Sequence, residues 1–161
     1  MRSEIIFKKP KLKDIKAMQE LVRDEVASGL ILPRSDDEIS TNIRSYILAC
    51  KVDEESKVEQ IVGFCALHIH TVNLAEVRSL VVSKDLRGGG VGSELVKQIL
   101  KEAESYEIKT VFTLTYRKSF FEKLGFVEIP KSDLPAQKIW ADCIKCKHFP
   151  VCDEIALIYK F

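Results

Sequence analysis

Two stretches of the chain carry apolar residues at intervals of three and four, which is the spacing of one face of a helix. The first stretch contains Leu12, Ile15, Met18, Val22 and Val26, and the second contains Val91, Leu95, Ile99 and Ala103. A further helix is expected after Ser35-Asp36-Asp37-Glu38, because this segment has the form of a capping box and apolar residues follow it at helical spacing. A short helix is expected at residues 118–124, and Gly29 is a plausible stop for the first one.

Runs rich in β-branched and aromatic residues, bounded by turn residues, predict strands. They cover residues 5–9, 46–52, 60–70, 75–83, 110–115, 126–129 and 154–161. The charged connection at residues 53–57 suits an antiparallel hairpin. The order is then a hairpin followed by strand, helix, strand, helix and strand, without an internal repeat. This order predicts a mixed α/β domain of the α+β class.

Composition and charge argue against several classes of protein. The 161 residues fit one domain over residues 1–161, and 46% hydrophobic residues suffice for a core. The net charge of +1 argues against a nucleic-acid binder. There is no apolar run of transmembrane length and no signal-peptide pattern at the start, so no membrane contact is expected. With five cysteines, an odd number, these features favour a reducing, cytoplasmic location.

A glycine-rich loop stands between a predicted strand and the helix that begins near Val91. Its sequence is Arg87-Gly88-Gly89-Gly90-Val91-Gly92-Ser93. Glycine allows positive φ and close approach of a ligand, and the first amides of a helix have no partner inside it. Such amides bind phosphate or pyrophosphate well. The simpler interpretation is a flexible turn. A Walker A loop is disfavoured because no lysine follows Gly92. A Rossmann dinucleotide-binding loop is disfavoured because it should come earlier in the chain.

These residues resemble the signature of the GCN5-related N-acetyltransferases (GNAT), which is Arg/Gln-x-x-Gly-x-Gly/Ala. The strand before the loop and the later Phe121-x-x-x-Gly125-Phe126 resemble two further landmarks of the family. The resemblance implies a GNAT fold, with a central, mostly antiparallel sheet, one parallel, splayed pair of strands and flanking helices. It also implies acetyl-CoA as co-substrate and direct attack of an amine on the thioester.

A narrower resemblance is to the acetyltransferase domain of N-acetylglutamate synthases, particularly the short, free-standing ones. It is carried by residues 29–35, 75–80, 114–115, 134–138 and 138–154. It implies acetylation of glutamate or a close relative at the first step of arginine synthesis. The alternatives left open are an acetyltransferase for another amine, such as a polyamine, a drug or a protein terminus, and a CoA-binding regulatory module without catalysis. A homodimer is an expectation drawn from many relatives.

The family resemblance assigns roles to residues of the cofactor site. The backbone of Leu80, Val81 and Val82 should pair with the pantetheine arm. Arg87, Gly88, Gly89, Gly90, Val91, Gly92 and Ser93 should hold the pyrophosphate. Phe121 is also expected to bind the cofactor. Many family members have a tyrosine at this position to protonate the leaving thiolate, so Tyr116 is the substitute, unless the thiolate leaves unassisted.

Glu76 is the candidate general base, because a lone charge in a β-rich run is unusual and the synthases have a glutamate there. Strand alternation places Glu76, Arg78 and Leu80 on one face. An ion pair with Arg78 at a strand edge is an equally weighted alternative. Arginine suits the carboxylates of an amino acid, so Arg34, Arg78 and Lys138 are expected to bind substrate. His68 and His70 are expected to be structural histidines, with a catalytic role as the minor alternative.

A cluster near the end of the chain has metal-ligand residue types. Cys143, Cys146, His148 and Cys152 lie within ten residues, which allows a zinc site. Apolar packing of reduced cysteines and an oxidation-sensitive thiol pair are the other two interpretations. No metal is therefore assigned, and zinc stays an open hypothesis.

Overall fold

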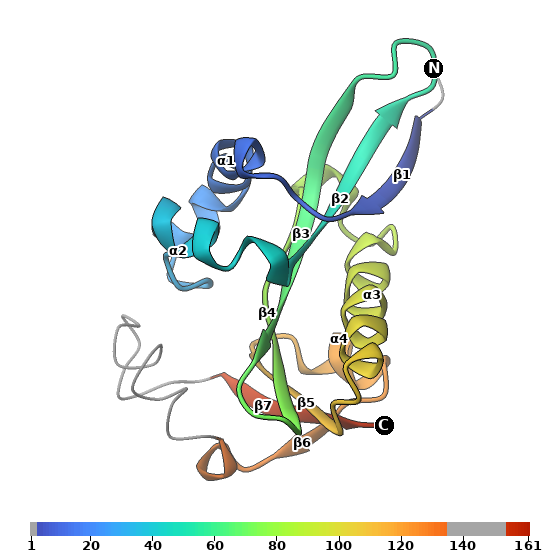
Figure 1. Cartoon of the computed structure of the whole chain (residues 1–161). Helices are drawn as coiled ribbons and strands as arrows, with labels where there is room; N and C mark the ends of the chain where they lie inside the picture. The colour runs from blue at the N-terminus through green and yellow to red at the C-terminus, as the bar shows by residue number, and fades with distance from the viewer. Residues whose placement is uncertain (1–2, 135–153) are drawn as a thin grey trace.

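The computed structural model describes residues 3–134 and 154–161. These residues form a sheet of seven strands in the order β1-β2-β3-β4-β5-β7-β6 (Figure 1). The strands are β1 (Ser3–Lys8), β2 (Tyr46–Asp53), β3 (Glu59–Ile69), β4 (Leu74–Val82), β5 (Thr110–Thr115), β6 (Val127–Ile129) and β7 (Ile155–Lys160). All neighbouring strands are antiparallel except β4 and β5, which are parallel. The mixed, mostly antiparallel sheet expected from the sequence is confirmed.

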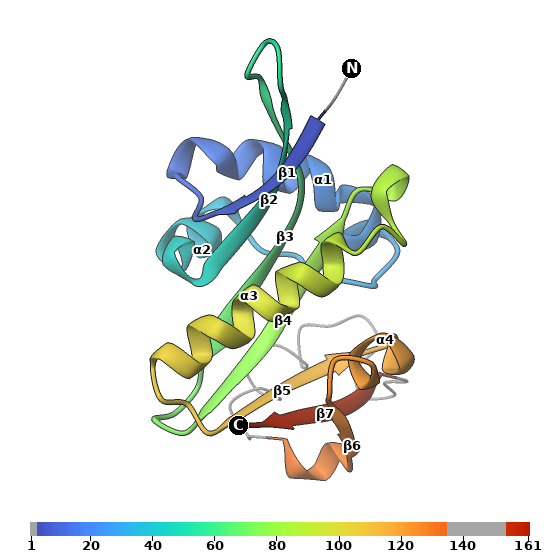
Figure 2. The same ribbon diagram turned by 90° about the vertical axis from the view of Figure 1, so that its right-hand side faces the viewer.

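The parallel pair separates after a few residues. Its ladder pairs Leu74 with Thr110, Ala75 with Val111 and Glu76 with Phe112, whereas β4 continues to Val82. Beyond the ladder, the hydroxyl of Thr113 donates to the carbonyl oxygen of Val77 at 3.0 Å. Figure 2 shows β4 and β5 diverging along their length. The splay leaves backbone of β4 without a strand partner on that side, next to an open space.

Helices cover both faces of the sheet. α3 (Val91–Ser105) packs on one face through Leu95, Val96 and Ile99, which are fully buried, and it runs across β2, β3 and β4 (Figure 2). α1 (Ile15–Ala27) and α2 (Asp36–Thr41) lie on the opposite face (Figure 1). The apolar spacing of α1 and α3 explains this arrangement, because a helix with one apolar stripe must bury it.

Helix ends follow local sequence signals. α1 ends at Ala27, and Gly29 follows in the left-handed region with φ +80°, so the expected stop is confirmed. The capping box at Ser35 is present, but α2 ends at Thr41 and the chain tightens into a 3-10 turn before β2. The first helical turn, Leu12–Asp14, is also 3-10. α4 (Lys118–Glu122) is two residues shorter than expected.

A bulge at Ser79 changes the alternation of β4. Ser79 has a φ of +59°, and three residue steps on β4, from Arg78 to Val81, oppose two steps on β3. As a result, Val77 and Leu80 pack toward the α3 side, while Val81 packs toward α1 and α2. The expectation that Leu80 shares a face with Glu76 and Arg78 was therefore wrong, because strand alternation holds only for a regular strand.

Candidate active site

The splay between β4 and β5 opens into a cavity of about 440 Å³. β4 supplies one wall, β5 and the turn after it supply the other, and the segment between α1 and α2 closes a third side. The lining residues are Glu25, residues 29–32, Arg34, residues 76–82, Arg87, residues 113–117, Phe121 and Glu154. Parallel strands that diverge thus create the concave site that a small molecule needs.

Glu76 lies in the middle of the sheet and is only 1% exposed. Its Oε1 atom is 3.0 Å from Nε2 of His70, a residue just beyond the end of β3. The sequence left open an ion pair between Glu76 and Arg78 at an edge. β4 lies between β3 and β5, so neither residue is on an edge strand, and this part of the alternative was wrong. A carboxylate buried this deeply must have polar partners, and it borders the cavity.

Arg34 and Arg78 line the same cavity as Glu76. Burial raises the pKa of Tyr46, and the positive charges of Arg34 and Arg78 oppose that rise. Two cations and one buried carboxylate that line the same cavity suit a ligand with an ammonium group and one or more carboxylates. Lys138, the third expected carboxylate ligand, lies outside the described residues.

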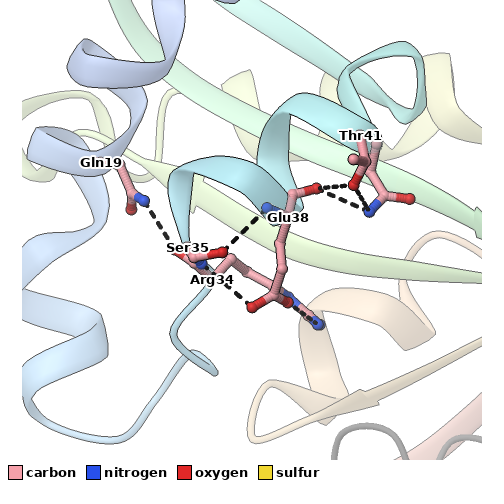
Figure 3. A network of polar contacts seen from close by, with 6 residues as sticks. Gln19, Arg34, Ser35, Glu38 and Thr41 are labelled. Carbon is pink, nitrogen blue, oxygen red and sulfur yellow. Dashed lines mark hydrogen bonds and ion pairs between the residues drawn. The ribbon is translucent and has the colours of Figure 1, made fainter.

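The backbone around Arg34 is held by polar contacts from α1 and α2 (Figure 3). Nε2 of Gln19 donates to the carbonyl oxygen of Arg34 at 2.8 Å. The next residue, Ser35, accepts from the amide of Glu38 at 3.1 Å and thereby caps α2. The Arg34 side chain is 12% exposed, with Nη1 3.8 Å from Oε2 of Glu38. The capping box therefore positions a cavity residue as well as starting a helix.

The glycine loop has the backbone that its sequence predicts. Gly88 and Gly90 have φ of +84° and +88°, and a Cβ atom at either would meet nothing within 4 Å. The space that a side chain would occupy at each of these glycines is therefore open. Gly90 is the N-cap of α3, so the amides of Val91, Gly92 and Ser93 have no acceptor inside the helix. Gly88, Gly89, Gly90, Val91, Gly92 and Ser93 adjoin the cavity along the chain but do not line it.

Arg87, by contrast, reaches the cavity and is engaged there. Its Nη2 atom is 2.6 Å from Oε1 of Glu25, and its Nε donates to the carbonyl oxygen of Val82 at 3.2 Å. The sequence does not single out Glu25, because it is one of several charged residues on the polar side of α1. Only its distance in space to the loop, 62 positions further along, marks it as part of the site.

Two aromatic residues lie at the β5 end of the cavity. Tyr116 lines it and is 39% exposed. Phe121 also lines it but is 2% exposed and packs edge-on against Phe120 and Phe126. Arg117, which the sequence did not single out, borders the same end and lies 4.5 Å over the ring of Phe120. Of the two expected catalytic or cofactor residues, only Tyr116 brings a hydroxyl to this wall.

The zinc hypothesis rested on Cys143, Cys146, His148 and Cys152, which lie outside the described residues. Within residues 3–134 and 154–161, no group of three or more His, Cys, Asp or Glu side chains could hold a metal ion. In the same part of the chain, no helix has the length and apolar character needed to cross a membrane.

The splayed sheet, its cavity and the glycine loop are typical of an acetyltransferase, and comparison with known proteins agrees. Residues 44–128 match the family model of the acetyltransferase (GNAT) domain. A Chlorobaculum tepidum protein named uncharacterized N-acetyltransferase CT2212 is 36% identical over 92% of this chain and 91% of its own length. The chain belongs to the GNAT family and is an N-acetyltransferase of this type, as its motifs indicated.

The names of more distant relatives specify a substrate class. The amino-acid acetyltransferase of Mycobacterium tuberculosis is 28% identical over 82% of this chain and 74% of its own length. N-acetylglutamate synthase from Neisseria gonorrhoeae, solved with coenzyme A and N-acetyl-glutamate, has a TM-score of 0.82 at 19% identity. That match covers 99% of this chain but 36% of the gonococcal one. Rv2747 from M. tuberculosis, solved with CoA, gives 0.79 at 20% identity and covers 97% of this chain and 99% of its own. These structural matches establish the fold.

Proposed function

We propose that this protein transfers the acetyl group of acetyl-CoA to the α-amine of an amino acid, with glutamate or glutamine as acceptor. In this role it would make the N-acetylated amino acid with which arginine synthesis begins. The observation that carries the proposal is one cavity bordered by a buried carboxylate, Glu76, and by two guanidinium groups, Arg34 and Arg78. The names of the mycobacterial and gonococcal relatives point to the same substrate class.

The residues around the loop fit acetyl-CoA. The splayed stretch of β4 offers backbone groups of Leu80, Val81 and Val82 to an amide-containing arm, as an added strand would use them. The open faces of Gly88 and Gly90, and the first amides of α3, suit a pyrophosphate. Gly89, Val91, Gly92 and Ser93 complete this loop, and Arg87 and Phe121 border the pantetheine side. Two solved relatives of this fold contain CoA, which supports the assignment.

The chemistry assigned to the chain's own residues begins with a proton. An amino acid reaches the site as an ammonium ion, and the Glu76 carboxylate accepts one proton, directly or through a water, as its N–H bond breaks. The free amine then attacks the thioester carbonyl carbon. The resulting tetrahedral centre collapses as the C–S bond breaks. Its nitrogen loses a second proton to solvent, and the thiolate takes a proton from Tyr116, which solvent then reprotonates, or directly from solvent. Arg34 and Arg78 hold the substrate carboxylates throughout.

A thiol-release assay with acetyl-CoA and a panel of glutamate, glutamine, aspartate, ornithine and spermidine tests this function. We expect turnover with glutamate or glutamine. Preference for spermidine would instead indicate a polyamine acetyltransferase, against which the positive charges of Arg34 and Arg78 argue. Binding of acetyl-CoA without turnover of any amine would support a regulatory module.

Two variants test the residue roles. Glu76→Gln should lower kcat by about 10²-fold or more at neutral pH, while Kd for CoA stays within a factor of two. Glu59→Gln, which removes a surface carboxylate paired with Lys8, is the matched control and should leave both unchanged. Arg34→Gln should raise KM for the amino acid by about tenfold or more, because a charged hydrogen bond is lost, and spare KM for acetyl-CoA.

A further inference from the structure

A second ionisable side chain contacts Glu76 and is not among the residues that line the cavity. It is His70, whose side chain is 8% exposed beside the 2% exposed carboxylate. The imidazole ring is held between two other rings: the edge of His68, with centroids 4.6 Å apart, and the tilted ring of Phe112, 5.3 Å away. Neither the resemblance to relatives nor the proposed function assigns a role to this histidine.

The turn between β3 and β4 fixes where His70 lies. The amide of His70 donates to the carbonyl oxygen of Leu74 at 2.9 Å, which closes the turn. The carbonyl oxygen of Asn73, inside the turn, accepts from the amides of Lys109 and Thr110 at 3.2 and 3.0 Å. The turn is therefore tied to the start of β5. Since Glu76 is two residues into the β4–β5 ladder, the backbones of His70 and Glu76 belong to one rigid corner of the sheet.

A buried carboxylate is useful as a base only while it is ionised, and burial by itself favours the neutral acid. A hydrogen bond donated to the carboxylate favours the charged form, and at low local dielectric such a bond is stronger than in water. Nε2 of His70 is the donor if the ring carries its proton there, and Glu76 can accept only in its ionised form or at a carbonyl oxygen. With the proton on Nε2, this hydrogen bond favours ionised Glu76 over the neutral acid, because a charged acceptor makes the stronger bond.

We propose that His70 is a positioning residue for the general base: its Nε2–H group donates to Oε1 of Glu76, keeps that carboxylate ionised and fixes its orientation toward the cavity. This inference rests on the proposed function, in which Glu76 accepts the substrate proton. His70 keeps its own proton throughout. The proton removed from the ammonium group goes to Glu76 and then to solvent after the product leaves.

Other charged and titratable groups face the same carboxylate and shape its titration. From β3, His68 is the cross-strand partner of Glu76, and from β4, Arg78 is two residues further along. From β5, the partner is the uncharged Phe112. Across the cavity lie Arg34, Tyr116 and Glu154. None of these groups is replaced in a His70 variant, but His68 loses its ring contact with His70. A change in the pH profile is therefore assigned to the His70 bond only where His70→Gln, which restores the donor but not the ring, reverses it.

The test compares three variants by kcat, KM and pH–rate profile. His70→Leu keeps the volume but removes the donor, so kcat at pH 7 should fall by about 10- to 100-fold, and the acidic limb of the profile should move to higher pH. KM for acetyl-CoA should stay within a factor of two. His70→Gln has an amide donor of similar reach and should restore most of kcat and the original limb. Val72→Ala, in the same turn but 86% exposed, is the control and should behave as the wild type.

An unchanged acidic limb in His70→Leu, with kcat intact, would overturn the inference. If His70→Leu does not fold, His70→Gln decides alone: a limb moved despite the restored donor would equally overturn it. Failure of the proposed function looks different, because neither the wild type nor any His70 variant would then release thiol with glutamate or glutamine. A readout that needs no turnover is the nitrogen-detected NMR spectrum of the imidazole. We expect a protonated Nε2 in His70 that loses its hydrogen-bonded shift in Glu76→Leu, which has no acceptor, and an unprotonated Nε2 in the wild type at pH 7 would contradict the proposal.

Discussion

The guanidinium group of Arg87 lies 2.6 Å from the carboxylate of Glu25, which joins the loop before α3 to the last turn of α1. The second carboxylate oxygen of Glu25, Oε2, is buried without a hydrogen-bond partner among the described residues. The backbone carbonyl of Glu25 also accepts from the amides of Leu30 and Ile31. One residue thus contacts Arg87 and anchors the segment that leads to Arg34.

The charge of Glu25 should oppose binding of a pyrophosphate near Arg87. Glu25→Gln keeps the size and removes the charge, so we expect Kd for CoA to fall by about three- to tenfold, as measured by calorimetry, because a partly exposed pair contributes on the order of 1 kcal/mol. Asp24→Asn is the matched control, since Asp24 pairs with Lys84 on the exposed surface and carries the same charge. Equal effects of both variants would indicate a general change in net charge and would contradict a local role for Glu25.

The left-handed conformation of Gly90 makes a prediction about stability. Gly90→Ala should destabilise the protein by about 1–2 kcal/mol, because an L-residue is strained at this φ. Contacts add nothing to this cost, since the new methyl group would meet open space. Urea unfolding without CoA measures it.

Gly92 gives the contrasting case for that measurement. It lies inside α3, and its added Cβ would make ordinary contacts of 3.4 and 3.5 Å with Phe120 and Val82. Gly92→Ala should therefore leave stability unchanged or raise it by up to about 1 kcal/mol, since alanine favours the helix. A larger loss for Gly92→Ala than for Gly90→Ala would refute the conformational explanation.

Loss of the α2 cap should affect both folding and substrate binding. Ser35→Ala removes the acceptor for the amide of Glu38 and should cost about 1 kcal/mol. Because Arg34 directly precedes the cap, we also expect KM for the amino acid to rise while KM for acetyl-CoA does not. Ser40→Ala, in the same helix, removes only a hydroxyl that donates to the carbonyl of Asp37. If both serine variants change KM alike, the cap has no special link to Arg34.

The buried thiol of Cys65 predicts how stability depends on alkaline pH. Burial raises the pKa of Cys65 from 9.0 to about 12. Between these values the unfolded chain loses the proton and the folded chain keeps it, so the contribution is complete below pH 9 and declines as the pH rises toward 12. Compared with Cys65→Ala, the wild type should lose up to about 1.4 kcal/mol more per pH unit above pH 9.5.

Chemical unfolding of both proteins at pH 7, 9.5 and 10.5 measures that difference. Val62→Ala, a truncation in the same apolar cluster, is the control and should lower stability by a similar amount at each pH relative to the wild type. Parallel curves for the wild type and Cys65→Ala would show that the thiol ionises as readily in the folded chain as in the unfolded one.

Much of the fold follows from local patterns. The apolar stripes of α1 and α3, the stop at Gly29, the cap at Ser35 and the positive φ of Gly88 and Gly90 are properties of a few adjacent residues, and each was expected from them. The face on which Leu80 lies was predicted wrongly, because it depends on the pairing of two strands and not on adjacent residues. The bulge at Ser79 arises from how β4 pairs with β3, and no residue type near it requires an extra residue there.

The sequence by itself determined the family, the elements and the types of residue available for chemistry, because motif spacing, apolar periodicity and helix caps act over short distances along the chain. Only the tertiary structure decided which of these residues meet. It joined Glu76 to His70 through the corner where β3, β4 and β5 come together, and it joined Arg87 to Glu25 across the β4–α1 contact. Such pairs depend on how sheet splay and helix packing orient whole elements, and that orientation is set by the sum of many weak contacts across the core.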